Sequence, residues 1–176
     1  MPAFRGPGID TVIDESHAGE ATNRICFPGI DSCVVVLAVC PTKLIGTHLT
    51  VLDTKDQINA LLDQMLAAGG GGSTNVYVAG PFRRNFKPHT AASSFNTRKK
   101  IRDRIRNKLG KQPGISFLDT DILGGFPKHL LFSRNGATAD FSWTDSGGGG
   151  DRPSIHVGIP PDLEFQAYAI TNFVRR

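Results

Sequence analysis

A cysteine and a histidine on neighbouring apolar segments are the pair of residues best suited to chemistry in this sequence. Cys33 opens the run CVVVLAV, and His48 lies within the next run, LIGTHLTVL. The thiolate is the reactive form of cysteine, and an adjacent imidazole supplies the base that a weakly acidic thiol needs. Packing alone is the alternative interpretation, because a buried cysteine behaves as a small hydrophobic residue.

Both residues lie on segments that are predicted to form one antiparallel hairpin. Residues 33–39 are a continuous apolar run, typical of a strand buried on both faces, and residues 44–52 form the next strand. The short connection CPTK favours antiparallel pairing. A turn centred on this connection pairs Cys33 with residue 49 or 50. His48 is then a diagonal neighbour, about 7–8 Å away at Cα, and the two side chains can meet.

A capped helix is predicted after the hairpin. Thr54 and Gln57 form a capping box in TKDQINALLDQMLAAGG, and Gly69 ends the helical pattern. The apolar stripe of this helix has helical spacing and consists of Ile58, Leu61, Leu62, Met65 and Leu66. The run GGGGST that follows lacks the lysine of a phosphate-binding loop, so we interpret it as a flexible connector.

The rest of the chain predicts further strands and one more helix. In chain order we expect a strand at 75–80, a basic helix at 97–109, a strand at 115–120, a Gly-rich loop at 122–128, a hairpin at 129–143 turned at Asn135-Gly136, a strand-like segment at 154–159 and a helix near 162–173. This order predicts an α+β fold, a layered α/β sandwich.

The polar N-terminal part and the Gly-rich C-terminal part set the expected domain limits. Residues 1–24 show no period and are expected to form a loose arm, followed by a turn at FPGIDS. Residues 25–176 are expected to form a single domain, of which 145–176 are a Gly-rich loop and a C-terminal extension.

Composition is that of an ordinary folded domain. The chain has 176 residues, of which 39% are hydrophobic and 20% charged. No apolar stretch approaches the roughly 18 residues of a membrane span, and the first residues lack the apolar core of a Sec signal peptide. We therefore expect a cytoplasmic protein, or one that is secreted or translocated into a host cell without such a signal.

The chain has three cysteines, Cys26, Cys33 and Cys40. So small and odd a number argues against a disulfide framework. Their even spacing matches no zinc pattern, so neither a metal nor another cofactor is expected. Cys26 and Cys40 are interpreted as buried hydrophobic residues.

Positive charge is concentrated in the second helix. The net charge is +4, and residues 98–108 carry seven basic residues and one acidic residue, with Arg83, Arg84 and Lys87 upstream. Such a patch can contact nucleic acid, an anionic membrane or an acidic protein, although a charge run is usually a solvated helix face. We expect a protein partner, and neither nucleic acid nor a membrane.

The ordered set of segments resembles the CheD-type glutamine deamidases, which share a catalytic core with cytotoxic necrotizing factor and Burkholderia lethal factor. The resemblance covers roughly residues 25–145. It is carried by IDSCVVV, GTHL, LLDQM, VYVAG, NTRKKI, the glycines at 124–125 and HLLFSRNGATADF.

The resemblance implies a mostly antiparallel mixed sheet packed with two main helices, and a protein-glutamine deamidase that converts a glutamine to a glutamate. Cys33 would be the nucleophile and His48 the general base, joined as a thiolate–imidazolium pair. We expect a divergent, toxin-like or effector-like member. The alternatives are a deamidase of chemotaxis receptors and a non-catalytic binding module that uses the basic helix.

Two departures from the family concern the residues around this pair. The family commonly has Gly-Ser or Ser-Gly before its cysteine, and this chain has Asp31-Ser32. CheD-like members place a threonine six residues before the cysteine to orient the histidine, and this chain has Phe27. The main-chain carbonyl of Phe27 is therefore the first candidate for that role, with Thr22 as a weaker one.

Overall fold

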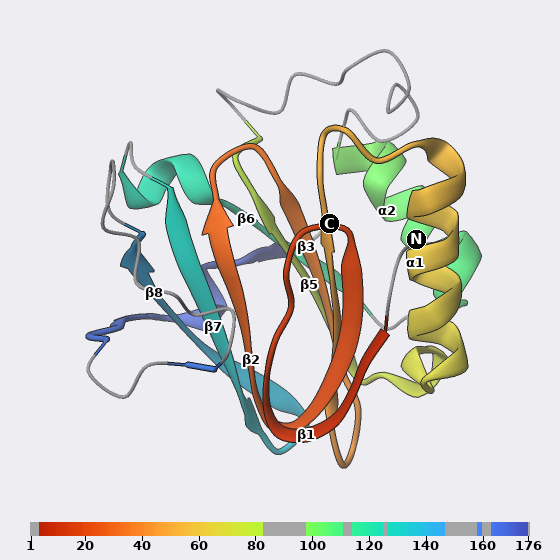
Figure 1. The fold of residues 1–176 in the computed structure, drawn as a ribbon, viewed down its shortest axis with the longest axis horizontal. Helices are drawn as coiled ribbons and strands as arrows, with labels where there is room; N and C mark the ends of the chain where they lie inside the picture. The colour runs from red at the N-terminus through yellow and green to blue at the C-terminus, as the bar shows by residue number, and fades with distance from the viewer. Residues whose placement is uncertain are drawn as a thin grey trace.

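The computed structural model describes residues 4–82, 98–110, 114–124, 127–146, 158–159 and 163–175. Within these residues the strands form one curled sheet in the order β10-β6-β5-β3-β4-β2-β7-β8-β9, with β1 paired to β2 (Figure 1). The strands are β1 (Phe4–Val12), β2 (His17–Ile30), β3 (Val34–Val39), β4 (Leu44–Leu49), β5 (Asn75–Gly80), β6 (Ile115–Asp119), β7 (Lys128–Asn135), β8 (Thr138–Asp145), β9 (Gln166–Tyr168) and β10 (Val174–Arg175).

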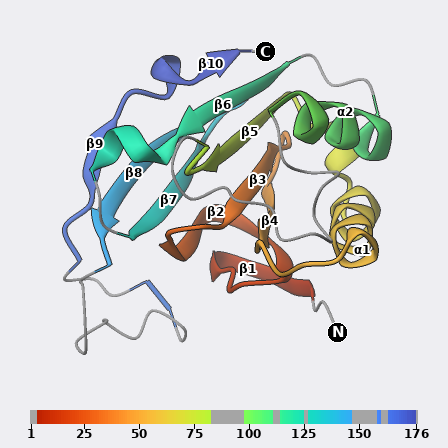
Figure 2. The same ribbon diagram turned by 90° about the horizontal axis from the view of Figure 1, so that it is seen from above.

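The expected mixed α/β architecture is confirmed. Most neighbouring strands are antiparallel, and only the β1–β2 and β5–β6 pairs are parallel among the pairs that the structure describes. Two helices, α1 (Lys55–Ala67) and α2 (Arg98–Leu109), lie side by side on one face of the sheet (Figures 1 and 2). No helix in the described part of the chain is long and apolar enough to cross a membrane.

Strand β3 lies deep in the core, because all six of its residues are buried, as are all six of the neighbouring β4. Its alternate side chains serve two different layers, as expected for a strand covered on both faces. Val34, Val36 and Ala38 pack with the apolar stripes of the two helices. Val35 and Leu37 face the inside of the curled sheet, where they join an aromatic core of Phe27, Tyr77, Phe132, Phe141 and Phe173.

The predicted first helix is confirmed, including its capping box at Thr54 and Gln57. Four residues of the expected stripe are buried, but Leu66 is 44% exposed, so the stripe ends one residue early. The GGGGST run is not simply a connector, because Gly70–Gly72 form a short 3-10 helix, η1.

The expected loose arm at residues 1–24 is wrong for its described part, residues 4–24. Strand β2 is central, because it pairs with β4 through residues 17–21 and with β7 through residues 24–30. The small residues of this strand give it a weak strand signal in the sequence, but the structure requires at least one of them. A Cβ at Gly19 would lie 2.6 Å from the carbonyl oxygen of Arg5 on β1, which is too close. No domain boundary therefore falls at residue 25.

The turn expected at FPGIDS begins later than predicted. Pro28 and Gly29 belong to β2, at a register shift in its ladder with β7 between Phe27 and Ile30. Gly29 has φ of 65°, a conformation that glycine adopts without strain, and it lets the strand bend there. Residues 31–32 then lead directly to Cys33.

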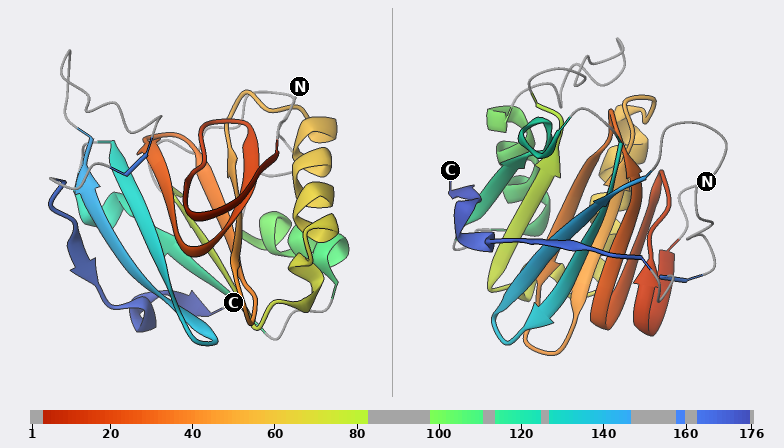
Figure 3. Two further views of the ribbon diagram at one scale, coloured as in Figure 1. Left: turned by 60° about the horizontal axis from the view of Figure 1, so that its bottom comes forward. Right: turned by 90° about the vertical axis from the view of Figure 1, so that its left-hand side faces the viewer.

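The helix expected near 162–173 is also wrong. Strand β9 pairs with β8 at one edge of the sheet, and β10 pairs with β6 at the other edge, with the 3-10 helix η4 (Ile170–Asn172) between them. Residues 169–173 therefore join both ends of the sheet, which must curl to be bridged by so short a segment (Figures 2 and 3). Phe173 in this bridge closes the aromatic core.

The hairpin turned at Asn135-Gly136 is confirmed, and it is longer than expected. Strands β7 and β8 pair from Lys128 opposite Asp145 to Asn135 opposite Thr138, and Gly136 has φ of 60° in the turn. The strand-like segment at 154–159 falls largely outside the described residues, as do Arg83, Arg84 and Lys87.

The glycine at position 46 of β4 is predicted to be required for core packing. A Cβ there would lie 2.6 Å from Cζ of Phe27, a ring already packed against Phe132. We expect Gly46→Ala to lower the free energy of unfolding by about 1–3 kcal/mol through overpacking. Gly72→Ala is the matched control, because a Cβ at Gly72 meets nothing within 4 Å. Equal urea midpoints for the two variants would contradict this.

Candidate active site

The β3–β4 hairpin brings Cys33 and His48 together. Val35 pairs with His48 and Val34 with Leu49. Continued by one residue, this register places Cys33 opposite residue 50, one of the two positions predicted from the sequence. Directly opposite residues share a face of the sheet, and His48 therefore points with Val35 into the inner core. The Cys33 sulfur, a ring nitrogen of His48 and a carboxylate oxygen of Glu15 all lie within 4.8 Å of one another.

A main-chain carbonyl fixes the His48 ring. Its Nδ1 lies 3.1 Å from the carbonyl oxygen of Ile13, and the ring is fully buried. A carbonyl only accepts hydrogen bonds, so Nδ1 carries the proton of the neutral ring and Nε2 keeps its lone pair. Nε2 has no hydrogen-bond partner among the described residues. The ring is thus held in the tautomer that a general base requires.

The carbonyl that orients His48 was expected to be that of Phe27, and this assignment is corrected to Ile13. The backbone of Phe27 lies in the β2–β7 ladder opposite Leu130. Its ring instead packs edge-on against the imidazole, with 6.2 Å between the ring centroids. Thr22, the weaker candidate, is exposed, and its carbonyl accepts a hydrogen bond from Arg134.

Sequence reasoning missed Ile13 and Glu15, because both lie in the segment interpreted as a loose arm. That segment is the turn between β1 and β2, which is tied to β4 and to the turn after it. The N–H of Ser16 donates to the carbonyl of His48 at 2.8 Å, and the Ser16 hydroxyl donates to the buried carboxylate of Asp53 at 2.6 Å. Asp53 also accepts from the N–H of Thr50 at 2.7 Å. This clamp holds residues 13–16 over the cysteine–histidine pair.

Both members of the pair are uncharged at neutral pH. Burial, with a smaller contribution from the nearby Glu15 carboxylate, raises the pKa of Cys33 to about 12, against the opposing effect of a hydrogen bond with Ser32. Burial lowers the pKa of His48 to about 4, against the opposing effect of its hydrogen bond to Ile13. The expected thiolate–imidazolium pair is therefore wrong for this arrangement, which is a thiol beside a neutral imidazole.

A neutral pair of this kind can act by general-base catalysis. The lone pair on Nε2 can accept the thiol proton as the sulfur attacks, so the charges form only during the reaction. The thiol itself lies 3.9 Å from Oε1 of Glu15, which is exposed. Cys33 is only 4% exposed, so a reacting group reaches the sulfur only after a local rearrangement of the residues that cover it.

The segment before Cys33 is held by a second histidine. His129 at the start of β7 is buried, and its Nδ1 accepts a hydrogen bond from the N–H of Gly29 at 3.1 Å. This contact gives His129 a structural role, because it fixes the backbone of β2 four residues before Cys33.

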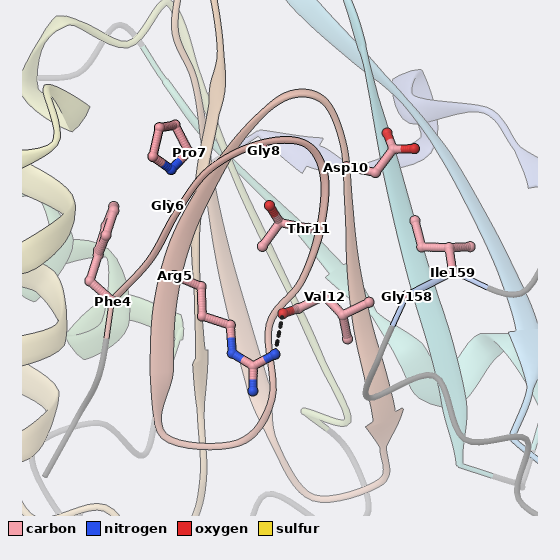
Figure 4. A pocket seen from close by; sticks show the side chains of 10 residues that line it. All are labelled: Phe4, Arg5, Gly6, Pro7, Gly8, Asp10, Thr11, Val12, Gly158 and Ile159. Atoms are coloured by element: carbon pink, nitrogen blue, oxygen red, sulfur yellow. Dashed lines mark hydrogen bonds between the residues drawn. The ribbon is translucent and has the colours of Figure 1, made fainter.

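A cavity of about 430 Å³ lies within the curl of β1 (Figure 4). It is lined by Arg5 and other β1 residues together with Gly158 and Ile159, and not by Cys33 or His48. Arg5 connects the cavity to the turn over the site, because its guanidinium pairs with Asp14 at 2.5 Å and donates to the carbonyl of Val12 at 3.5 Å.

The buried His48 is predicted to make stability depend on pH. Its pKa falls from 6.5 to about 4 on folding, so the unfolded chain takes up the proton first as pH falls. The stability gained from the neutral ring is complete above pH 6.5 and is lost progressively toward pH 4, by up to about 3 kcal/mol. We expect His48→Gln to flatten the fall of the urea midpoint between these values, and His17→Gln to keep it. An equally steep fall in His48→Gln would contradict the prediction.

Comparison with known proteins does not add a family to this geometry. The chain matches no protein-family model and no curated protein sequence.

Proposed function

We propose that the chain is a protein-glutamine deamidase in which Cys33 is the nucleophile and His48 the general base. The observation that carries the proposal is the buried Nε2 of His48, which has no partner among the described residues and lies on a ring fixed by Ile13. A polar nitrogen buried in this way costs about 1–3 kcal/mol unless it gains a partner, and reaction with the adjacent thiol provides one. The resemblance to CheD-type deamidases, cytotoxic necrotizing factor and Burkholderia lethal factor supports the same pair.

The proposed reaction exchanges the side-chain amide for a carboxylate with one water and no cofactor. Cys33 Sγ bonds to the amide carbon while Nε2 of His48 takes the thiol proton. The imidazolium gives this proton to the nitrogen as the carbon–nitrogen bond breaks, which releases ammonia and leaves a thioester. Nε2 then takes a proton from water, whose oxygen attacks the thioester carbon. The carbon–sulfur bond breaks, the thiolate is reprotonated, and glutamate is released.

Access to the sulfur is proposed to control the reaction. The Glu15 carboxylate raises the pKa of the Cys33 thiol and lies against it, so the resting thiol stays protonated and shielded. Ser16 next to it has φ of 58°, which is uncommon for a residue with a side chain. A substrate loop that displaces this turn would remove the carboxylate and place the glutamine amide at the sulfur in one step.

We propose a divergent, toxin-like or effector-like deamidase that acts on a protein. This choice rests on Asp31-Ser32 and Phe27, which depart from the residues of the chemotaxis branch at the same positions. The chemotaxis-receptor deamidase is the alternative within the same chemistry. Action in the cytoplasm, or in a host cell after translocation, is part of this proposal.

The burial of the pair supports a second candidate, a non-catalytic binding module that uses the basic helix α2. Part of the charge on this helix is already engaged within the fold: Arg98 pairs with Asp119, Arg104 donates to Asn59, and Lys108 pairs with Asp63. Lys99 and Arg106 are exposed and would contact an acidic protein. In this candidate Cys33 and His48 only fill the core.

Incubation with glutamine-containing substrates in heavy-oxygen water tests the deamidase directly. Unfolded casein and an N-blocked Gln-Gly peptide are suitable probes, because neither requires a folded recognition surface. We expect wild type to form glutamates that carry one solvent oxygen and to release one ammonia for each, measured by mass spectrometry and an ammonia assay. Cys33→Ser is expected to abolish both products.

Cys40→Ser is the matched control, since Cys40 is also buried and its thiol donates to the carbonyl of Gly69, as a serine hydroxyl can. This variant is expected to keep full activity. Equal product in wild type and Cys33→Ser would exclude Cys33 as the nucleophile, and no product from either substrate would favour the binding module.

A further inference from the structure

Glu15, Cys33 and His48 together form a donor set of oxygen, sulfur and nitrogen. Their ligand atoms lie within 4.8 Å of one another, and the sulfur-to-carboxylate distance is 3.9 Å. Around a tetrahedral zinc ion, with bonds of about 2.0–2.3 Å, ligand atoms lie about 3.3–3.7 Å apart. The three atoms therefore need to approach one another by at most about 1.5 Å, through small rotations of the Glu15 and Cys33 side chains.

The His48 ring is arranged as a metal-binding histidine usually is. Such a histidine donates its second N–H to a carbonyl or carboxylate, which fixes the ring and leaves the other nitrogen for the metal. Here Nδ1 faces the Ile13 carbonyl at 3.1 Å, and the fully buried Nε2 has no hydrogen-bond partner among the described residues. This nitrogen is the independent indication that the cluster is suited to a ligand.

We propose that Glu15, Cys33 and His48 bind one Zn²⁺ ion, with the fourth position open to water. Sulfur and imidazole donors favour zinc over magnesium or calcium, which prefer oxygen ligands alone. The spacing of the cysteines predicted no metal site, because a spacing rule detects only motifs in which several cysteines are ligands. Here Glu15 lies in the β1–β2 turn, Cys33 immediately before β3 and His48 in β4, and only the fold brings the three together.

Zinc at this site would also switch off the proposed deamidase. Coordination uses the same sulfur electron pair that would attack the amide, and it occupies the nitrogen that would accept the thiol proton. This consequence rests on the proposed function, whereas zinc binding does not.

Zinc binding is tested on the full chain after chelator treatment and desalting. Zn²⁺ is titrated in competition with a chromophoric chelator, and Co²⁺ is used as a spectroscopic probe of sulfur coordination. We expect one Zn²⁺ per chain and a sulfur-to-cobalt charge-transfer band. Glu15→Gln, Cys33→Ser and His48→Gln should each weaken binding at least about 10-fold, because even substitutions beyond the ligands cost about 10–100-fold. Cys33→Ser should also remove the band.

The variants separate this site from adventitious binding. Glu15→Gln changes an exposed side chain of nearly the same shape, so its loss of affinity is not a folding defect, and Cys40→Ser should bind as wild type does. No zinc binding at micromolar concentration, or binding unchanged in both Cys33→Ser and Glu15→Gln, would overturn the proposal. The deamidase assay is run on the zinc-free chain, so the two proposals can fail separately. Zinc binding without deamidation would refute only the proposed enzyme, and deamidation without zinc binding would refute only the metal site.

Discussion

The hydrogen bond from Nδ1 of His48 to the carbonyl of Ile13 is the contact on which the candidate site depends. It joins the β1–β2 turn to β4, sets the tautomer of the ring, and leaves Nε2 with a lone pair, on a ring of which one nitrogen lies within 4.8 Å of the Cys33 sulfur. Without it, the ring could rotate about its side-chain bonds and present either nitrogen to the sulfur. The clamp between Ser16 and Asp53 supports this contact by holding the turn in place.

The site combines features that packing alone does not require. An apolar residue at position 48 would fill the inner core without a buried nitrogen that lacks a partner, and would avoid the loss of stability on acidification. Phe27 and Gly46 instead fit around an imidazole, the ring of Phe27 edge-on at 6.2 Å and Gly46 making room for that ring. A neutral thiol and a neutral imidazole are tolerated in such a core, whereas an ion pair would require strong compensation for lost solvation. The same neutral pair can serve chemistry once Glu15 is displaced, or join Glu15 in binding a thiophilic metal.

Features that depend on residues close together in the chain could be predicted from the sequence, and features that depend on distant residues could not. The meeting of Cys33 and His48 was predictable, because a short turn and a strict two-residue period define the register of one hairpin. Helix α1 was predictable from its cap and stripe. The role of Ile13 was not predictable, because a main-chain carbonyl leaves no side-chain signature. Glu15 was missed because it lies in the turn between two strands that are rich in small and polar residues. Strands β9 and β10 were missed because their pairing with distant strands overrides a weak local preference.

Alkylation of Cys33 by iodoacetamide near neutral pH, in wild type and His48→Gln, tests the central claim most directly. Cys26 and Cys40, also buried and also with raised pKa values, serve as internal controls in the same peptide map. If His48 removes the thiol proton, its loss should slow alkylation of Cys33 by at least about 10²-fold and leave the other two thiols unchanged. An unchanged rate at Cys33, or equal changes at all three cysteines, would contradict a functional cysteine–histidine pair.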